Sequence, residues 1–591
     1  MKGNRTYISR IQSRMFFLAF ATAFTAAATQ TLAVLIDKVI ICTFYGETEI
    51  AAVVLADPFF YLLEIPAAGL AAGIQTVCAK ELGSGEIDSV NRRFSQIFFL
   101  FAIVLTVLTA VSFLCVPQMA ILFGARGKTA ALQPYAVQYL YGLSFEILPY
   151  VLFCIMTPIV IMDNGGKLIS IVSVCGCLTD IVLDLLSVRF GWGLFGIGLA
   201  SSASAAVYFL AAMTHFLNRN RVIRLQPVRI SLRELKEIFH AAVPKAVFSM
   251  ANAMRSALLI SIVTVTGGVI GTCVYSIHET VVYTTAILAT GVAGAVGILT
   301  GICCGEKNGE ELEGTGILAH RYCLFLSAGT AAVLAVCARP LAAALTETGT
   351  TAELLVFALR CVIFMVPFSI LINARISYLQ AVGQIRAAQW MAIASNLVFP
   401  LVLAFLLAVP FGIRGVFIAF PAAQVMTLMA SWLFHKKRTG KTIPSAADYL
   451  AVDESFNALP GDVITYPIKT MEDCALASEQ IILFCRGHKL DERKGMLAGL
   501  CMEELTTNVF EHGLRPGQEI RSADIRAVID DGDVILRVRD SGAAFNLKNH
   551  ADRLAEEDGV GTGTGLKILL HSAKSVSYYR TYGMNTTIIR V

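Results

Sequence analysis

The sequence predicts an all-α polytopic membrane bundle followed by a smaller soluble α/β domain. Of the 591 residues, 56% are hydrophobic and only 15% are charged, whereas about 25% of an ordinary soluble chain is charged. Residues 1–440 hold 30 Lys and Arg and 21 Asp and Glu, but residues 441–591 hold 17 and 22. This composition excludes a single soluble enzyme, a fibrous protein and a disordered chain.

Twelve apolar runs are long enough to be transmembrane helices. A bilayer core about 30 Å thick is crossed by about 20 helical residues. The runs lie near 15–43, 50–79, 94–119, 133–161, 168–188, 194–216, 241–268, 271–303, 316–345, 352–381, 387–409 and 414–434. Because twelve is an even number, we expect both ends of the bundle on one side of the membrane.

The orientation follows from basic residues, which are enriched in cytoplasmic loops. They cluster before the first run and after the second, sixth and twelfth runs; the loop 124–128 breaks this pattern but is outnumbered. We therefore expect a multi-pass protein of the cytoplasmic membrane, with both termini and the soluble domain in the cytoplasm.

The membrane part contains an internal repeat. The segment 78–86 is echoed by 303–310, and 190–200 is echoed by 411–419. Six helices per repeat give two lobes of parallel topology, and transporters built in this way place their substrate cavity between the lobes. The predicted organisation is a first six-helix lobe, a basic linker, a second six-helix lobe, a short linker and a soluble domain, at 1–216, 217–240, 241–440, 441–454 and 455–591.

Three carboxylates are predicted inside the first lobe. Asp37 lies in the first apolar run, and Asp180 and Asp184 share one face of the fifth because they are four residues apart. Ionisable groups at membrane depth are costly and usually face a cavity. With the hydroxyl of Ser201, such a cluster could hold Na⁺ or share protons; alternatively, each carboxylate could be satisfied by the backbone or by Lys38.

Other buried charges give weaker signals. Glu64, Glu146 and Glu279 are weaker candidates for the same role. Glu279 could instead form a structural pair with Arg255 or Arg375.

Several motifs resemble the multidrug and toxic compound extrusion (MATE) family over about residues 10–435. They are Leu35–Ile41, Glu81–Glu86, Asp163–Lys167 and Asp180–Asp184. The resemblance implies two six-helix lobes that alternate access and export small organic compounds against Na⁺ or H⁺ influx. Related flippases of lipid-linked sugars share this fold, so flipping is an alternative.

The resemblance also implies an ion site. One branch of the family uses an Asp in the first helix, an Asn-x-x-x-Asp in the fifth and a hydroxyl in the sixth. Asp37, Asp184 and Ser201 match three of these positions, whereas Asp180 replaces the Asn. Arg255 and Arg375 occupy helices that carry acidic residues in other branches, so the second lobe is not expected to hold that ion site.

The C-terminal segment alternates predicted strands and helices. The strands are 463–469, 525–529, 533–539, 576–580 and 587–591, and the helices are 471–486, 491–511 and 566–575.

Three motifs in the C-terminal segment are suited to binding a nucleotide. Glu504 and Asn508 lie on one helix face, where a carboxylate can act as a general base and an amide oxygen can bind Mg²⁺. Asp540 can accept from an exocyclic amino group, beside Gly542. A glycine-rich run before a helix can bind phosphates. Such a run precedes the helix 566–575 and contains Gly559, Gly561, Gly563 and Gly565.

Together these motifs resemble the Bergerat ATP-binding fold, and most closely the anti-sigma-factor serine kinases, over about residues 455–591. The resemblance implies ATP and Mg²⁺ as cofactors, with Asn508 as metal ligand and Glu504 as the base that transfers phosphate to a Ser or Thr of an anti-anti-sigma-like protein. Thr586 matches a Thr near adenine. No nucleic-acid partner is expected.

Two functions from different classes remain open. The protein is either an ion-coupled exporter whose soluble domain regulates it, or a membrane sensor that gates a protein kinase or partner-switching module. In a third reading, the soluble domain only sequesters its partner.

Overall fold

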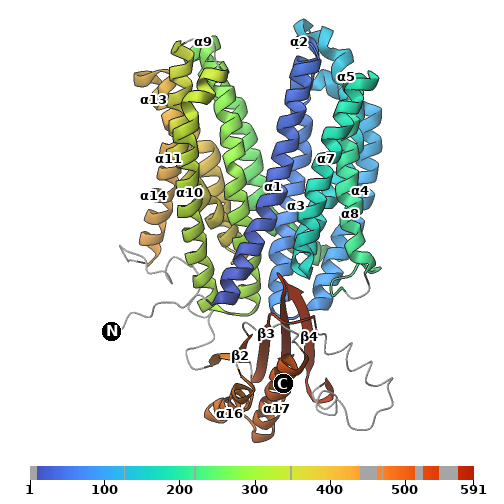
Figure 1. The fold of residues 1–591 in the computed structure, drawn as a ribbon, viewed down its shortest axis with the longest axis vertical. Coiled ribbons are helices and arrows are strands. Elements are labelled where there is room, and N and C mark those ends of the chain that lie inside the picture. The colour runs from blue at the N-terminus through green and yellow to red at the C-terminus, as the bar shows by residue number, and fades with distance from the viewer. Residues whose placement is uncertain are drawn as a thin grey trace.

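The computed structural model describes residues 9–125, 127–218, 221–345, 349–439, 462–468, 470–512, 523–530, 532–544 and 570–591. Its helices form two bundles that stand side by side, and a sheet domain lies against one end of both (Figure 1). We call this the docked end of the bundle. The predicted linker 441–454 lies outside the described residues.

The first lobe runs from α1 to α8. Its α-helices are α1 (Arg10–Phe44), α2 (Glu47–Leu55), α3 (Asp57–Gly83), α4 (Ile87–Leu122), α5 (Gln133–Leu143), α6 (Ile147–Val160), α7 (Gly166–Phe190) and α8 (Gly193–Leu217). The hydroxyl of Ser9 accepts from the Gln12 N–H and so caps the start of α1. Between α6 and α7, the π-helical turn η3 (Ile161–Gly165) breaks the helix, and Asn164 there has a φ of 58°.

The second lobe runs from α9 to α14. Its α-helices are α9 (Leu232–Gly305), α10 (Gly309–Leu345), α11 (Gly349–Ala381), α12 (Ile385–Ile393), α13 (Phe399–Phe411) and α14 (Ile413–Thr439). The π-helical turn η4 (Ala394–Val398) joins α12 to α13, and three short 3₁₀ and π segments in the first lobe complete the described helices: η1 (Gly127–Leu132), η2 (Ser144–Glu146) and η3.

The long helix α9 is two antiparallel helices that meet at Gly268. This glycine has φ 55° and ψ −147°, a conformation that essentially only glycine adopts. The hydroxyls of Thr264 and Thr272 are 3.4 Å apart, although eight residues of continuous helix span about 12 Å. The reversal falls between the predicted runs 241–268 and 271–303.

Ten helical segments of the described chain are long and apolar enough to cross a membrane. Two of them, Ala130–Phe190 and Leu232–Gly305, have 61 and 74 residues, and each covers two of the predicted runs. The mostly helical, two-lobed membrane fold is confirmed. The count of twelve crossings stays a prediction.

The soluble domain contains a five-stranded antiparallel sheet in the order β1-β2-β3-β5-β4. The strands are β1 (Val463–Ile468), β2 (Ala523–Asp530), β3 (Asp533–Asp540), β4 (Ser575–Thr581) and β5 (Met584–Arg590), and its helices are α16 (Met471–Gly487) and α17 (Glu492–His512). A reciprocal capping box between Thr470 and Asp473 starts α16. The predicted small α/β domain is therefore confirmed.

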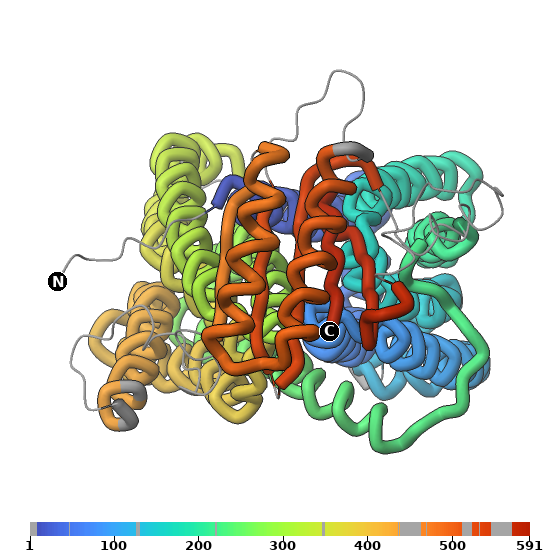
Figure 2. Tube along the Cα trace, turned by 90° about the horizontal axis from the view of Figure 1, so that it is seen from below, coloured from blue at the N-terminus to red at the C-terminus, as the bar shows by residue number. Residues whose placement is uncertain are grey.

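The two faces of this sheet have different neighbours. Side chains alternate between the faces along each strand. Leu536, Val538 and Ile589 pack with α16 and α17 in the core of the domain, whereas Tyr579 and Ile588 belong to the apolar core of the membrane part. Viewed from below, the two helices lie on the side of the sheet away from the bundle (Figure 2).

Candidate ion-binding and nucleotide-binding sites

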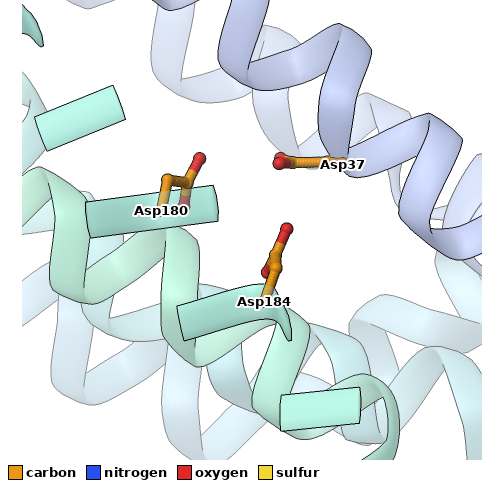
Figure 3. Close-up of side chains that lie close together, drawn as sticks. All are labelled: Asp37, Asp180 and Asp184. Carbon is orange, nitrogen blue, oxygen red and sulfur yellow. The ribbon is translucent and has the colours of Figure 1, made fainter. Parts of the chain in front are cut away.

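Three acidic side chains of the first lobe converge on one point. Asp37 on α1 faces Asp180 and Asp184 on α7 (Figure 3), and their carboxylate oxygens lie within 4.8 Å of one another. Asp184 is fully buried and Asp180 is 4% exposed. Four of these oxygens have no hydrogen-bond partner among the described residues: Oδ1 of Asp37, Oδ1 of Asp180, and both oxygens of Asp184.

Such a cluster cannot stay fully ionised without a counter-charge. Two unit charges about 5 Å apart repel by about 3 kcal/mol at an effective dielectric constant of 20. Hard cations take oxygen ligands at about 2.0–2.6 Å, so oxygens within 4.8 Å of one another can ligate one cation between them. A proton shared among the carboxyl groups would relieve the repulsion in the same way.

In the described part of the chain, the predicted hydroxyl ligand forms no hydrogen bond to the unpartnered oxygens of these carboxylates. Ser201 on α8 donates to the Ile197 carbonyl of its own helix at 3.5 Å. Ser204, nearly one turn further along α8, donates to the Ser201 carbonyl at 2.9 Å, and its side chain contributes to the electrostatic environment of Asp180. Glu146, rated as a weak candidate, is buried and interacts electrostatically with Asp180.

The second lobe neutralises its buried charge. Arg255 donates to both carboxylate oxygens of Glu279, at 2.8 and 3.1 Å, and to Asn252 Oδ1 at 2.9 Å. The guanidinium also lies 5.1 Å from the ring centroid of Phe420. The predicted structural pair of Arg255 with Glu279 is therefore confirmed. This bidentate pair leaves no excess negative charge at that place.

The soluble domain positions two residues of its first predicted motif on α17. The side-chain nitrogen of Asn508 donates to the Glu504 carbonyl at 2.6 Å and to Glu504 Oε1 at 3.1 Å. These bonds direct the amide oxygen of Asn508 away from Glu504, where it can act as an oxygen ligand for Mg²⁺. They also fix the Glu504 carboxylate beside it.

Asp540 ends β3 on the face of the sheet that α17 covers. Its Oδ1 accepts from the Gly542 N–H at 2.7 Å and from the Asn585 side chain at 2.9 Å. Burial raises the pKa of Asp540 above its ordinary value, and the hydrogen bonds from Asn585 and Gly542 partly oppose that rise. The carboxylate is thus held in one orientation with its other oxygen directed elsewhere.

Thr586 lies on the wrong face of the sheet for an adenine contact. It pairs with Arg539 and with Tyr579, whose side chains point to the membrane part. Asn585 is paired opposite Asp540, and Thr587, two residues further, shares its face. The prediction of Thr586 is therefore wrong in register by one residue, and a one-residue slip reverses the face.

The predicted phosphate-binding glycines lie outside the described residues: Gly559, Gly561, Gly563 and Gly565. Asp540 and Gly542 are brought together as predicted, and α17, which carries Glu504 and Asn508, packs on β3 in the same domain core.

These features define a two-lobed polytopic membrane protein with a buried acidic cluster in one lobe and a C-terminal α/β sheet domain. Residues 22–186 match the MatE family model, and residues 480–591 match the histidine kinase-like ATPase domain model. The chain thus combines a MatE domain with a C-terminal histidine kinase-like ATPase domain.

A curated relative supports the first assignment. The chain is 26% identical over 287 residues to a probable multidrug resistance protein NorM of Deinococcus radiodurans. The match covers 46% of this chain and 60% of that protein.

Solved structures support the fold of the membrane part. A MATE crystal structure in complex with MaL6 has a TM-score of 0.68 at 20% identity, and an outward-facing multidrug resistance MATE family transporter of the MOP superfamily has 0.68 at 21%. A MOP superfamily transporter from Pyrococcus furiosus has 0.67 at 20%. Each match covers 74% of this chain and 98% of the solved chain.

Proposed function

We propose that the membrane part is a secondary active exporter of small organic compounds, driven by Na⁺ or H⁺ entry through the first lobe. The convergence of Asp37, Asp180 and Asp184 supports this proposal most directly. Buried carboxylates without partners are costly, and a cation that binds and leaves during each cycle accounts for their retention. The related NorM protein is named for multidrug resistance.

The coupling works by exchange at this cluster. A cation or proton enters when the cluster is ionised and neutralises it, which changes the electrostatic free energy of the first lobe. Ligands shift a two-state equilibrium only through such differential affinity. Release of the cation on the other side restores the ionised cluster and completes the cycle.

The soluble domain binds ATP with Mg²⁺ in this proposal. Asp540, supported by Asn585, accepts from the adenine amino group, and Asn508 ligates the metal. Phosphates would be held by the glycine run 559–565. We place the domain and both termini in the cytoplasm, where ATP is present.

Transport is tested in liposomes that contain the purified full chain, an encapsulated or external organic dye and an imposed Na⁺ or pH gradient. We expect gradient-driven dye movement that Asp37→Asn or Asp184→Asn reduces to background. Asp88→Asn, an exposed residue at the start of α4, is the matched control and should transport normally. Transport that survives both cluster substitutions would contradict the assignment.

Phosphoryl transfer by the soluble domain is a second candidate activity. The position of Glu504, fixed beside Asn508 at 3.1 Å, suits a general base. Radiolabelled ATP offered with a candidate protein substrate distinguishes the cases. Phosphorylation that Glu504→Gln abolishes would identify a kinase, whereas unchanged partner binding without label transfer would identify a domain that only sequesters its partner.

A further inference from the structure

The sheet of the soluble domain presents three arginines to the membrane part, Arg526 on β2 and the pair Arg537 and Arg539 on β3. Arg537 and Arg539 are two residues apart on β3, so both point to the face opposite α17. Their side chains are only 4% and 3% exposed. Buried arginines are retained only with partners, and here carboxylates from another part of the chain supply them.

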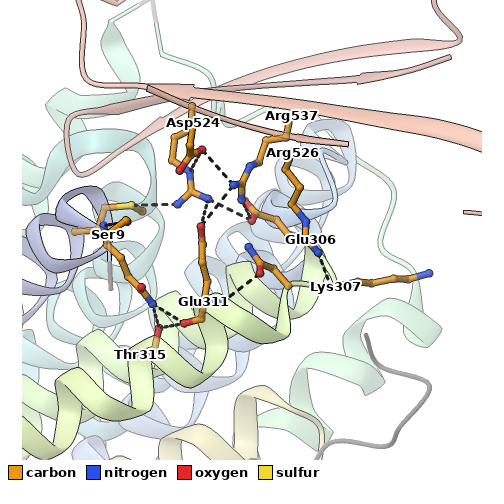
Figure 4. Close-up of polar contacts among 12 residues, drawn as sticks. Ser9, Glu306, Lys307, Glu311, Thr315, Asp524, Arg526 and Arg537 are labelled. Atoms are coloured by element: carbon orange, nitrogen blue, oxygen red, sulfur yellow. Dashed lines mark hydrogen bonds and ion pairs between the residues drawn. The ribbon is translucent and has the colours of Figure 1, made fainter. Parts of the chain in front are cut away.

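Acidic residues of the second lobe meet these arginines (Figure 4). Arg539 Nη2 lies 2.8 Å from Glu311 Oε1, and Arg537 pairs with Glu306. Asp524 on β2 completes the network at 3.2 Å from Arg537. Outside this network, Lys307 pairs with Asp530 at 2.8 Å.

The same sheet also contacts the first lobe. Ser577 on β4 donates to the Gly85 carbonyl, and Thr581 donates to the Met162 carbonyl. The Gly583 N–H donates to Asn164 Oδ1 at 2.7 Å. These bonds are uncharged and reach the loop after α3 and the break between α6 and α7.

The two lobes use equivalent loops for this contact. The segment 78–86, which contains Gly85, and the segment 303–310, which contains Glu306, are the halves of the internal repeat. One sheet therefore binds the corresponding turn of both lobes at once. The contact is made with repeated features of the bundle and not with one lobe alone.

At this end the lobes also touch each other. A Cβ on Gly83 of α3 would lie 2.2 Å from the Ile302 carbonyl of α9. A Cβ on Gly305 would lie 2.0 Å from the Lys80 carbonyl. Glycines at such crossings let helix backbones approach closely, so the seam between the lobes is closed where the sheet domain covers it.

We propose that the face of the ATPase-like sheet opposite α16 and α17 is a latch that holds the two lobes together at the docked end. Opening that end moves Gly85 away from Glu306, and a rigid sheet cannot remain bound to both. The domain must then leave at least one lobe before that end opens. This inference rests on the proposed alternating transporter, because only such a protein needs the seam to part.

Distances measured in the full chain in lipid bilayers test the latch. Spin labels carried by noncanonical residues at Asp88, near the start of α4, and at Arg386, near the start of α12, report opening of the seam between the lobes; both side chains are exposed. A second pair, at Arg386 and Glu479 on α16, reports docking of the domain. We expect one short distance for each pair in the wild type.

Charge reversal should release the latch. In Arg537→Glu/Arg539→Glu we expect a second, longer distance in both label pairs, with at least half of the molecules in it. Adding Glu306→Arg/Glu311→Arg should restore the short distances. Arg486→Glu/Arg493→Glu changes the same charge at exposed positions of the soluble domain and should leave both distributions unchanged.

Two outcomes would overturn the latch: a domain that undocks while the seam stays closed, or a domain that stays docked after charge reversal. Should the charge-reversed domain fail to fold, Glu306→Gln/Glu311→Gln weakens the same contact and leaves the sequence of the soluble domain unchanged. The same changes in both distances are then expected. No gradient or substrate is needed, so failure of transport and failure of the latch are separately visible.

Discussion

The two lobes follow one repeated plan but treat their buried charges in opposite ways. In the first lobe, Asp37, Asp180 and Asp184 face one another with four oxygens unpartnered within the described chain. In the second lobe, Arg255 binds Glu279 through two hydrogen bonds. A permanent protein counter-charge excludes a mobile one. The difference teaches that the two halves of a repeated fold can hold buried charge differently, one as a cluster of carboxylates and the other as a fixed ion pair.

The largest expected effect is on ion coupling. Asp184→Asn should remove gradient-driven transport, because an amide carries no charge for the cation to neutralise. Glu279→Gln should retain coupling, although the amount of folded protein falls. Comparison of initial rates per folded molecule under Na⁺ and pH gradients measures this. Equal losses of the transport rate in both variants would mean that ion coupling does not depend on the first lobe more than on the second.

Stability should change with opposite sign in the two lobes. Removal of one partner from a buried ion pair costs about 3–5 kcal/mol, and the partial exposure of Glu279 places Glu279→Gln at the low end. Asp184→Asn relieves repulsion and should stabilise the protein by about 1–2 kcal/mol. Thermal unfolding in one detergent, followed for both variants and the wild type, gives the two signs.

A substitution in the nucleotide site should change ATP binding without changing ion coupling in the membrane part. Asp540→Asn replaces one acceptor oxygen of the carboxylate by an NH₂ group and removes its charge. ATP binding should weaken about ten-fold or more, since hydrogen bonds to charged groups are worth about 1.5–3 kcal/mol. Ion dependence of transport should stay as in the wild type. Equilibrium binding of a fluorescent ATP analogue, paired with transport assays, separates the two effects.

The same site predicts a pH dependence. Burial raises the pKa of Asp540, and only the ionised carboxylate is a full acceptor. Affinity for ATP should therefore fall on acidification at a higher pH than an exposed Asp would give. Asp540→Asn should abolish that part of the dependence. A wild-type curve that is flat down to the ordinary Asp range would contradict the buried acceptor.

The smallest effect distinguishes two serines of α8. The hydroxyls of both serines donate to carbonyls of α8, Ser204 to Ser201 and Ser201 to Ile197, and Ser204 also contributes to the electrostatic environment of Asp180. Ser204→Ala should weaken the apparent affinity for the coupling ion a few-fold, as expected for one neutral hydrogen bond of about 1 kcal/mol. Ser201→Ala should change it less. Ion titrations of the transport rate compare the two variants.

Much of the architecture could be predicted from the sequence pattern alone. The length of an apolar run indicates a membrane helix, and the alternation of apolar and polar residues indicates a half-buried strand. The reversal at Gly268 falls where two predicted runs meet, and β3 ends at Asp540, one residue beyond the prediction. The face of Thr586 was mispredicted, since one residue of register decides it. The docking of Arg537 and Arg539 on Glu306 and Glu311 joins residues more than 220 positions apart. No local periodicity carries that information.

Direct cation binding by the purified full chain tests the central difference between the lobes. Bound Na⁺ is measured across a Na⁺ titration, and proton uptake is measured across a pH titration, for the wild type, Asp37→Asn/Asp184→Asn and Glu279→Gln. We predict a saturable site in the wild type and in Glu279→Gln that is absent from the double variant. Undiminished binding in the double variant, or loss of binding in Glu279→Gln alone, would contradict the assignment of the exchangeable cation to the first lobe.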